Sequence, residues 1–137
     1  LVMPALTAPA YDVDVMAIKG NVKAVVVRER LNPAGIPFQG NRVLNNKAIE
    51  SYCVEVSKAL KLDGLHDIDL MTNSDGEPCV IEVNPRYSGS IAASLTAGMP
   101  MIDIAILSLL GEKVPKISIE SDVTVIMDDS NKMRVVS

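Results

Sequence analysis

The sequence lacks both a long hydrophobic run and an excess of positive charge. A membrane-spanning helix needs about 20 consecutive apolar residues, and the richest apolar stretch, residues 101–110, is interrupted by Asp103 and Ser108. The formal net charge is −4, whereas nucleic acids and acidic membrane surfaces attract concentrated positive charge. The first residues show no signal-peptide pattern. These absences predict a cytoplasmic protein with neither a nucleic-acid nor a membrane partner.

Cysteine and histidine are also scarce, with two cysteines and one histidine among 137 residues. Cys53 and Cys79 fall at positions predicted to face the core, which favours inert buried thiols in a reducing compartment over a disulfide or a metal pair. His66 falls on the same strand face as Ile68, which indicates a place in the core or at a sheet edge rather than a metal or catalytic role.

Hairpins interleaved with helices predict the fold. Strand-prone segments span residues 11–19, 22–30, 65–72, 78–84, 123–127 and 133–136. Helical spacing runs to about Leu62 after an N-cap at Asn45 or Asn46, and two shorter helices are separated by a break at residues 98–100. A Pro- and Gly-containing loop occupies residues 31–40. This order predicts one α+β domain, an antiparallel sheet with helices packed on one face.

Acidic and amide side chains gather on one face of the second predicted hairpin. If Asp75 and Gly76 form its two-residue turn, Asp69 lies opposite Glu82, and the next residue pair on that face is Asp67 with Asn84. The other face is predicted to be apolar, with the pairs Ile68–Val83 and Leu70–Ile81. Facing carboxylates repel by up to about 1 kcal/mol, so this patch needs a compensating charge.

A hard divalent cation removes that repulsion. Mg²⁺ (or Mn²⁺) takes one or two carboxylates, an amide oxygen such as that of Asn84, and phosphate oxygens. Arg86, just past the strand, has the planar fork that suits the same phosphates. Two alternatives remain: an ordinary solvated polar face, or Asp69 and Glu82 as a general acid–base pair. The second is weaker, because nothing near them in sequence separates their pKa values.

The stretch VIEVNPRYSG, with Asp69 before its turn, resembles the end of the ATP-grasp nucleotide-binding module. The similarity is to carbamoyl-phosphate-synthase-like enzymes and carboxylate–amine ligases. YDVDVMAIKGNVKAVVVRERL resembles the family's upstream hairpin and AGMPMIDIAILSLLGEKVP its closing helices. The resemblance covers residues 1–115 and leaves 116–137 as a C-terminal β extension. It implies a fragment, the C-terminal lobe of a larger ligase whose N-terminal lobe would precede Leu1.

The resemblance also implies a set of site residues. The metal ligands would be Asp69, Glu82 and Asn84, and Arg86 would contact the transferred phosphate or the acyl phosphate. The nucleotide contacts would be Asp14 on the ribose, Met71 beside the adenine, Glu82 through the metal, and Met3 and Leu6 in a hinge at residues 2–6.

The activity implied is that of an ATP-dependent ligase. Family members phosphorylate a small carboxylate with ATP, and an amine or another nucleophile then attacks the acyl phosphate. The implied partners are ATP, a carboxylate and an amine, and the fragment alone is expected to be inactive. Residues Pro4, Ala5, Ala8 and Ala10 depart from the family's pattern around the hinge. They leave open a non-catalytic or degenerate module that serves as a structural or binding domain.

Three arginines are candidate ligands for a substrate carboxylate, namely Arg28, Arg30 and Arg42. With Gly20 and Asn21 as the turn of the first hairpin, Arg28 and Arg30 are predicted to face away from Asp12 and Asp14. Solvated surface is the favoured interpretation for all three. The run Ser88-Gly89-Ser90 either begins a phosphate-binding helix or, as we favour, supplies Ser90 as an N-cap.

Overall fold

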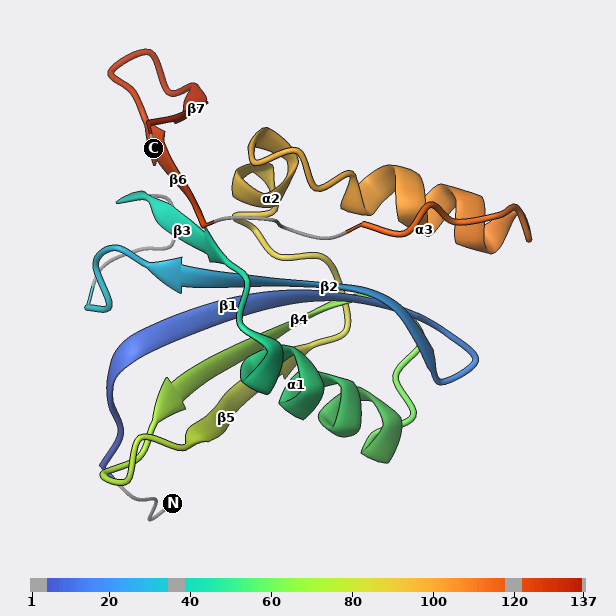
Figure 1. The fold of residues 1–137 in the computed structure, drawn as a ribbon, viewed down its shortest axis with the longest axis horizontal. Coiled ribbons are helices and arrows are strands. Elements are labelled where there is room, and N and C mark those ends of the chain that lie inside the picture. Colours follow the sequence, from blue (N-terminus) through green and yellow to red (C-terminus); the bar gives the residue numbers. More distant parts are fainter. Residues whose placement is uncertain (1–4, 35–38, 118–121, 137) are drawn as a thin grey trace.

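The computed structural model describes residues 5–34, 39–117 and 122–136 (Figure 1). Within them the strands are β1 (Thr7–Ile18), β2 (Asn21–Arg30), β3 (Asn41–Leu44), β4 (Gly64–Thr72), β5 (Pro78–Asn84), β6 (Val123–Met127) and β7 (Met133–Val135). The helices are α1 (Lys47–Ala59), α2 (Ala92–Thr96) and α3 (Met101–Leu109). No helix among these residues is long and apolar enough to cross a membrane.

All described strands belong to one sheet in the order β5-β4-β1-β2-β3-β6-β7. Every pairing is antiparallel, and β6 joins the sheet beside β3. The two strands of the C-terminal tail therefore continue the sheet on the β3 side. The predicted α+β class with an antiparallel sheet is confirmed.

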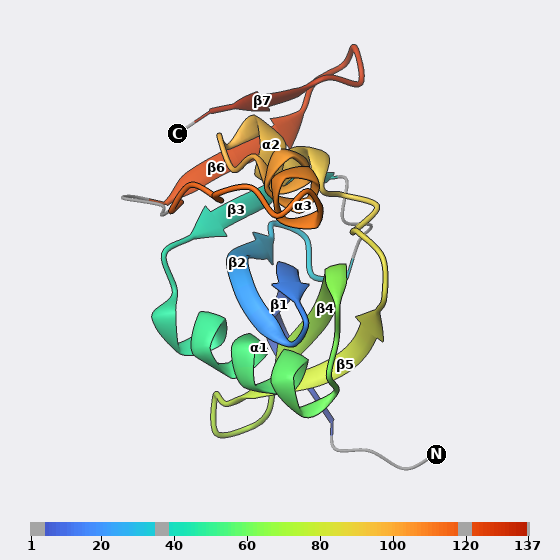
Figure 2. The same cartoon turned by 90° about the vertical axis from the view of Figure 1, so that its right-hand side faces the viewer.

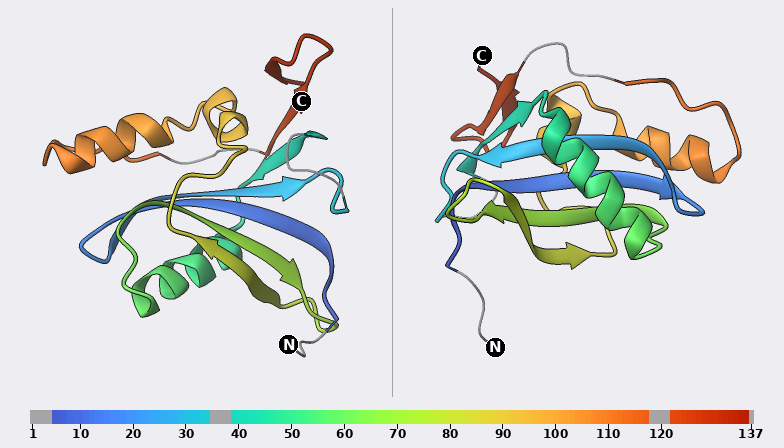
Figure 3. Two further views of the ribbon diagram at one scale, coloured as in Figure 1. Left: turned by 180° about the vertical axis from the view of Figure 1, so that it is seen from behind. Right: turned by 60° about the horizontal axis from the view of Figure 1, so that its bottom comes forward.

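The prediction that the helices cover one face of the sheet is wrong. Figures 2 and 3 show α1 on one face and α2 and α3 on the other. The strands are apolar on both sides: Val27 packs in a cluster with α1, whereas Val26 packs in a second cluster with α3. A continuous apolar run such as residues 25–27 is typical of a strand buried on both faces.

Each face has its own core. The α1 side is built from Tyr11, Val13, Val15, Val27, Leu44, Ile49, Cys53, Ile68 and Leu70. The α2/α3 side is built from Met16, Ala24, Val26, Val43, Ile91, Met99, Met101 and Ile104. His66 is buried on the α1 side, where its imidazole bonds to Ser57 Oγ at 2.8 Å. The structural role predicted for His66 agrees with these contacts.

The register of the first hairpin differs from the prediction. Lys19 and Gly20 both have positive φ, 50° and 76°, as a type I′ turn requires. The turn therefore lies one residue earlier than expected, and the register then shifts between Met16 and Ala17. Asp12 consequently pairs with Arg28 and accepts hydrogen bonds from Arg30. The prediction that these two arginines face away from the acids of β1 is therefore wrong.

The second hairpin keeps the predicted register at its acids. Asp69 pairs with Glu82 and Asp67 with Asn84. The register then shifts, so that Leu70 pairs with Val80 rather than with Ile81. Ile81 is the extra residue of this bulge and its side chain is exposed, which makes the predicted Leu70–Ile81 pair wrong.

Asn46, rather than Asn45, caps α1. Its side-chain oxygen accepts a hydrogen bond from the backbone N–H of Ile49 at 3.1 Å. An N-cap amide of this kind contributes about 1 kcal/mol to stability. We therefore expect Asn46→Ala to lower the free energy of unfolding by about 1 kcal/mol, and Asn46→Ser to be nearly neutral. Urea denaturation measures both, with Asn45→Ala as the matched control. Equal losses for the two alanine variants would contradict this assignment.

Candidate functional site

Polar residues occupy the α2/α3 face of the sheet at the end away from the β1–β2 turn. Strand pairing aligns them in two rows that cross neighbouring strands. One row is Arg28, Asp12, Asp69 and Glu82, and the other contains Asp14, Asp67 and Asn84. Because residues directly opposite in a sheet lie on the same face, this region brings together five carboxylates from β1, β4 and β5.

Arg28 neutralises the acid that lies deepest. Its Nε and Nη2 donate to the two oxygens of Asp14 at 3.1 and 3.2 Å, and Ser94 Oγ donates to the same carboxylate at 2.5 Å. Neither Asp14 nor Arg28 is exposed to solvent. A buried charge is tolerated when it is paired and hydrogen-bonded in this way. The contacts of Asp14 and Arg28 are therefore internal to the fold.

The same guanidinium holds the loop that follows β5. Arg28 Nη1 donates to Ser90 Oγ at 2.6 Å and to the carbonyl oxygen of Ser90 at 3.3 Å. Ser88 Oγ lies 3.0 Å from Ser90 Oγ. The N-cap predicted at Ser90 is wrong, since α2 begins at Ala92 after Ile91, without a side-chain cap. Ser90 instead fixes residues 88–90 against the acidic face.

Arg30 neutralises the second acid of β1. Its Nε donates to the two oxygens of Asp12 at 2.9 and 3.1 Å, and its Nη2 makes a further close contact with that carboxylate. Arg30 Nη2 also lies 3.4 Å from Asp69 Oδ2. The two arginines are thus mainly committed to the two acids of β1.

The acids of β4 are less well compensated. The Oδ1 atoms of Asp67 and Asp69 are both buried without a hydrogen-bond partner among the described residues. The guanidinium nearest to Asp67 is that of Arg28, at 4.0 Å. Burial, together with the neighbouring acids, raises the pKa of Asp67 to about 7 and that of Asp69 to about 6. Orphaned buried acceptors are rare in folded proteins, so these two oxygens point to a bound cation or proton.

A cavity of about 220 Å³ opens onto these acids. It is lined by Asp12, Arg30, Asp67, Asp69, Glu82, Asn84, Arg86 and residues 88–90. Glu82 is exposed and makes no ion pair with any described residue. Arg86 is also exposed, and its Nη1 donates to the carbonyl oxygen of Tyr87 at 2.9 Å. The cavity therefore combines anionic oxygens inside with an exposed guanidinium beside them.

The donor set suits a cation that is shared with another ligand. Among the described residues, no three His, Cys, Asp or Glu side chains are grouped so as to hold a metal ion on their own. Mg²⁺ rarely needs such a cage, because it keeps waters or phosphate oxygens beside one or two carboxylates. Asp69, Glu82 and the amide oxygen of Asn84 provide that smaller number of ligands in one cavity.

The structure brings together five of the residues predicted from the sequence, namely Arg30, Asp69, Glu82, Asn84 and Arg86. Asp14 and Arg28 do not join them, because both are fully buried. The predicted contacts of Asp14 with a ribose and of Arg28 with a substrate carboxylate would require this buried ion pair to open, and they stay predictions.

The remaining predicted residues lie elsewhere. Arg42 pairs across the strands with Glu29, on the α1 side, and its Nη2 lies 2.7 Å from Glu29 Oε2. This places it on the opposite face from the acids. Met71 is partly buried and follows Asp69 by two residues on β4, and Leu6 is partly buried just before β1. Met3 lies outside the described residues.

Asp12 is an acid of the site that was not predicted from the sequence, whereas Asp67 was predicted in the acidic patch but given no role. The signal for them is a repeated spacing, Asp12-x-Asp14 and Asp67-x-Asp69, which places two acids on one face of each strand. The strands pair so that Asp12 meets Asp69 and Asp14 meets Asp67. That pairing joins strands far apart in the chain and cannot be obtained from either hairpin alone.

Similarity to known proteins agrees with this geometry. A family model described as "ATP-grasp in the biosynthetic pathway with Ter operon" matches residues 1–129. The carbamoyl phosphate synthase large chain of Thermoanaerobacter sp. strain X514 is 36% identical over 77 residues, which cover 56% of this chain and 7% of that protein. The large chain from Methanothermobacter thermautotrophicus is 29% identical over 127 residues, covering 83% of this chain and 12% of that protein.

Solved structures show the same fold. The L-amino acid ligase of Bacillus licheniformis superposes with a TM-score of 0.69 at 20% identity, over 90% of this chain and 36% of that one. Biotin carboxylase from Campylobacter jejuni gives a TM-score of 0.67 at 15% identity, over 90% and 30% of the two chains. The chain thus spans a minor part of each relative. Since the family model matches most of its length, the resemblance found in the sequence is confirmed, and the chain belongs to the ATP-grasp family.

Proposed function

We propose that this chain binds ATP together with Mg²⁺ or Mn²⁺ and belongs to an ATP-dependent ligase that joins a small carboxylic acid to an amine through an acyl phosphate. The observation that carries the proposal is the pair of buried carboxylate oxygens on Asp67 and Asp69 that receive no hydrogen bond from the described part of the chain. They lie beside the exposed carboxylate of Glu82 and the guanidinium of Arg86 in one cavity. Membership of the ATP-grasp family supports the same chemistry.

Asp69, Glu82 and Asn84 would hold the cation. Glu82 is the ligand best able to face a phosphate as well, because it is exposed and free of ion pairs with the described residues. Asp67 lines the same cavity and would add negative charge close to the ion, because its buried Oδ1 has no hydrogen-bond partner among residues 5–34, 39–117 and 122–136. A divalent cation bound there would neutralise phosphate charge and orient the phosphates for transfer.

The two arginines of the cavity have different roles in this proposal. Arg86 is exposed at the cavity and offers its fork to equatorial phosphate oxygens. Arg30 is held by Asp12 and lies 3.4 Å from Asp69. Arg30 therefore orients Asp69 and screens its charge, and it is not needed as a ligand for the substrate carboxylate.

The nucleotide and domain assignments are also proposals. We infer that Met71 and Leu6 border the adenine site, with Met3 in the same hinge. Residues 1–115 would form the C-terminal lobe of the module and residues 116–137 a β extension. Because the chain covers only 36% of the L-amino acid ligase structure, we propose that the opposing lobe belongs to the same longer, cytoplasmic ligase.

Binding of Mn²⁺ tests the cation site directly. Titrating Mn²⁺ into isotope-labelled protein should broaden the amide signals of Asp69, Glu82 and Asn84 first, because paramagnetic relaxation falls steeply with distance. Glu82→Gln should weaken Mn²⁺ binding about tenfold or more, since one anionic ligand is lost. Glu77→Gln, in the turn of the same hairpin, should bind as the wild type does.

Broadening that is centred away from this cavity would overturn the proposed cation site. Equal Mn²⁺ affinity in the Glu82→Gln and Glu77→Gln variants would also overturn it. A protein that binds neither Mn²⁺ nor Mg²⁺–ATP would instead fit a non-catalytic module.

The raised pKa of Asp67 predicts how stability depends on pH without metal. Its folded-state pKa of about 7 exceeds its ordinary value of 3.8, so the folded state retains the proton more strongly than the unfolded state. The resulting stability is complete below about pH 4 and is lost as the pH rises through 7. Asp67→Asn should therefore be more stable than the wild type at pH 8, by about 2–4 kcal/mol, and less dependent on pH between 5 and 8.

Chemical denaturation in EDTA at pH 5 and pH 8 measures this difference. Asp75→Asn, in the exposed turn, is the control and should follow the wild type at both values. Mg²⁺ at millimolar concentration should stabilise the wild type at pH 8 through linkage. A wild-type profile that matches Asp67→Asn at both pH values would contradict the raised pKa.

Arg86 is predicted to act in phosphoryl transfer within the complete ligase. Arg86→Lys keeps the charge but loses the bidentate fork, so it should lower kcat more than it raises the KM for ATP. Loss of one such donor costs about 3 kcal/mol in a transition state, or roughly a hundredfold in rate. Steady-state kinetics at saturating Mg²⁺ would show this. Wild-type kinetics for Arg86→Lys would mean that the arginine only holds the end of β5.

A further inference from the structure

Half of the edge of β2 that faces away from β1 pairs with no strand among the described residues. β3 pairs only with the last part of β2, from Val27 to Arg30. On the edge away from β1, no described strand pairs with residues 21–26. No described turn or loop makes a backbone hydrogen bond with those residues either. An unpaired edge presents N–H and C=O groups that can pair with another extended chain.

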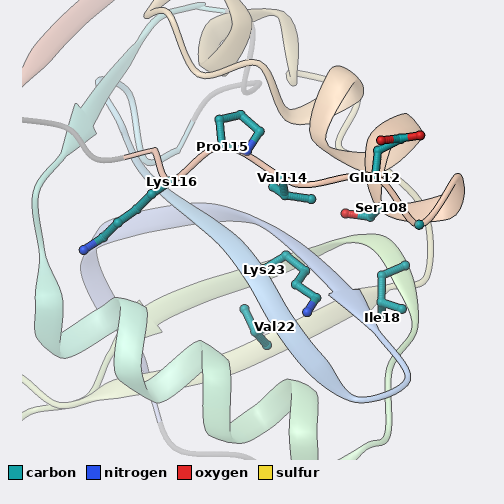
Figure 4. A pocket seen from close by; sticks show the side chains of 9 residues that line it. Ile18, Val22, Lys23, Ser108, Glu112, Val114, Pro115 and Lys116 are labelled. Carbon is teal, nitrogen blue, oxygen red and sulfur yellow. The ribbon is translucent and has the colours of Figure 1, made fainter.

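This free edge forms the floor of a groove. One cavity of about 520 Å³ lies between β2 and the residues that follow α3, and Figure 4 shows Ser108 and Val114 on the far side of it from Val22. A second cavity of about 620 Å³ lies between β2 and α1. Val22, Lys23 and Lys116 line both cavities, so the two adjoin along the strand. We call them together the β2-edge groove.

The walls of the groove carry apolar surface and an unsatisfied hydroxyl. Val54 of α1 lines one side, and Val114 and Pro115 line the other. Ser108 Oγ is buried and has no hydrogen-bond partner among the described residues, and Figure 4 shows it on the cavity side of α3. Extended chains alternate their side chains between two faces. A strand on this edge would therefore direct alternate side chains toward α1 and toward the segment after α3.

The charges of the groove favour an acidic occupant. Four lysines and three glutamates line it, on a chain whose net charge is −4. Lys47 and Lys58 are paired with Glu50 and Glu55 at 2.8 and 2.9 Å. Lys23 and Lys116 form no ion pair with any described residue. Glu112, beside the first cavity only, disfavours an acid there, so an acidic side chain fits best where the two cavities meet.

We propose that the β2-edge groove binds an extended segment of a partner protein by β-strand addition. The segment pairs with residues 21–26 of β2 and ends where β3 begins, which limits it to about six residues, or about 20 Å. Its alternate side chains are apolar, and one acidic side chain lies beside Lys23, which lines both cavities. The groove shares no lining residue with the acidic cavity, so this partner and ATP would bind at separate places.

A library of random peptides tests the proposal directly. Displayed nine-residue linear peptides are selected on the purified chain, and an enriched peptide is then synthesised. We expect apolar residues alternating with at least one Asp or Glu. Added to labelled protein, the peptide should slow hydrogen exchange of the outward amides of residues 21–26 by about tenfold or more, as new pairing protects them. No enrichment, or protection elsewhere, would overturn the proposal.

Backbone pairing has a sharper signature. Two versions of the peptide are synthesised. One is N-methylated at the odd-numbered residues, and the other is N-methylated at the even-numbered residues. Because alternate amides of a strand face the same edge, one version should lose binding at least tenfold and the other should retain it. Equal binding of both versions would mean that only side chains are recognised, contrary to strand addition.

The charge prediction has its own matched pair of variants. Lys23→Glu should lower the affinity for the peptide about three- to tenfold, as reversal of a partly exposed charge does. Lys132→Glu, in the β6–β7 turn, should leave the affinity unchanged. Equal effects would refute the role of Lys23. Protection of residues 21–26 that rises with protein concentration, in the absence of peptide, would assign the edge to a second copy of the chain and overturn the partner proposed here.

Discussion

The balance between five carboxylates and two arginines on one sheet face is the constraint on which the site depends. Arg28 and Arg30 bind Asp14 and Asp12 through several short hydrogen bonds. The carboxylates of β4 and β5 receive only distant or partial compensation. Burial of uncompensated charge is costly, so this part of the face takes up either protons or a cation. Because the arginines neutralise the acids of β1, the added proton or cation is needed at the acids of β4 and β5.

The same interaction fixes the geometry around the cavity. Arg28 extends from β2 to a carboxylate on β1 and to Ser90, 62 residues further along the chain. Ser94, in the middle of α2, donates to the same carboxylate. Strand, loop and helix therefore meet at one buried ion pair. Because this pair is fully buried and bonds to Ser90, the loop after Arg86 is placed by the core of the fold rather than by contacts at the surface.

The sequence was sufficient for the acidic pairs of the second hairpin, but not for the bulge beside them or for the register of the first hairpin. Asp69 and Glu82 could be paired correctly because the apolar and polar faces of that hairpin separate cleanly. In the first hairpin, a lysine with positive φ moves the turn, and a bulge then shifts the register. Neither leaves a compositional signal, and together they reverse the predicted orientation of Arg28. The pairing of β1 with β4 also depends on tertiary structure, which is why Asp12 was not predicted to join Asp67 and Asp69.

One continuous sheet face carries both a core and a site, and this division explains how the fold tolerates its acids. Toward the β1–β2 turn the face is apolar, and Met16 and Val26 pack beneath α3. Burial of each such side chain stabilises the fold by about 1.5–3 kcal/mol. Each facing pair of like charges destabilises it by up to about 1 kcal/mol. Hydrophobic packing at one end of β1 and β2 therefore holds the acids of the other end in register before any cation binds. A cation at the acidic end would stabilise a fold that already exists, and its ligands would be preorganised.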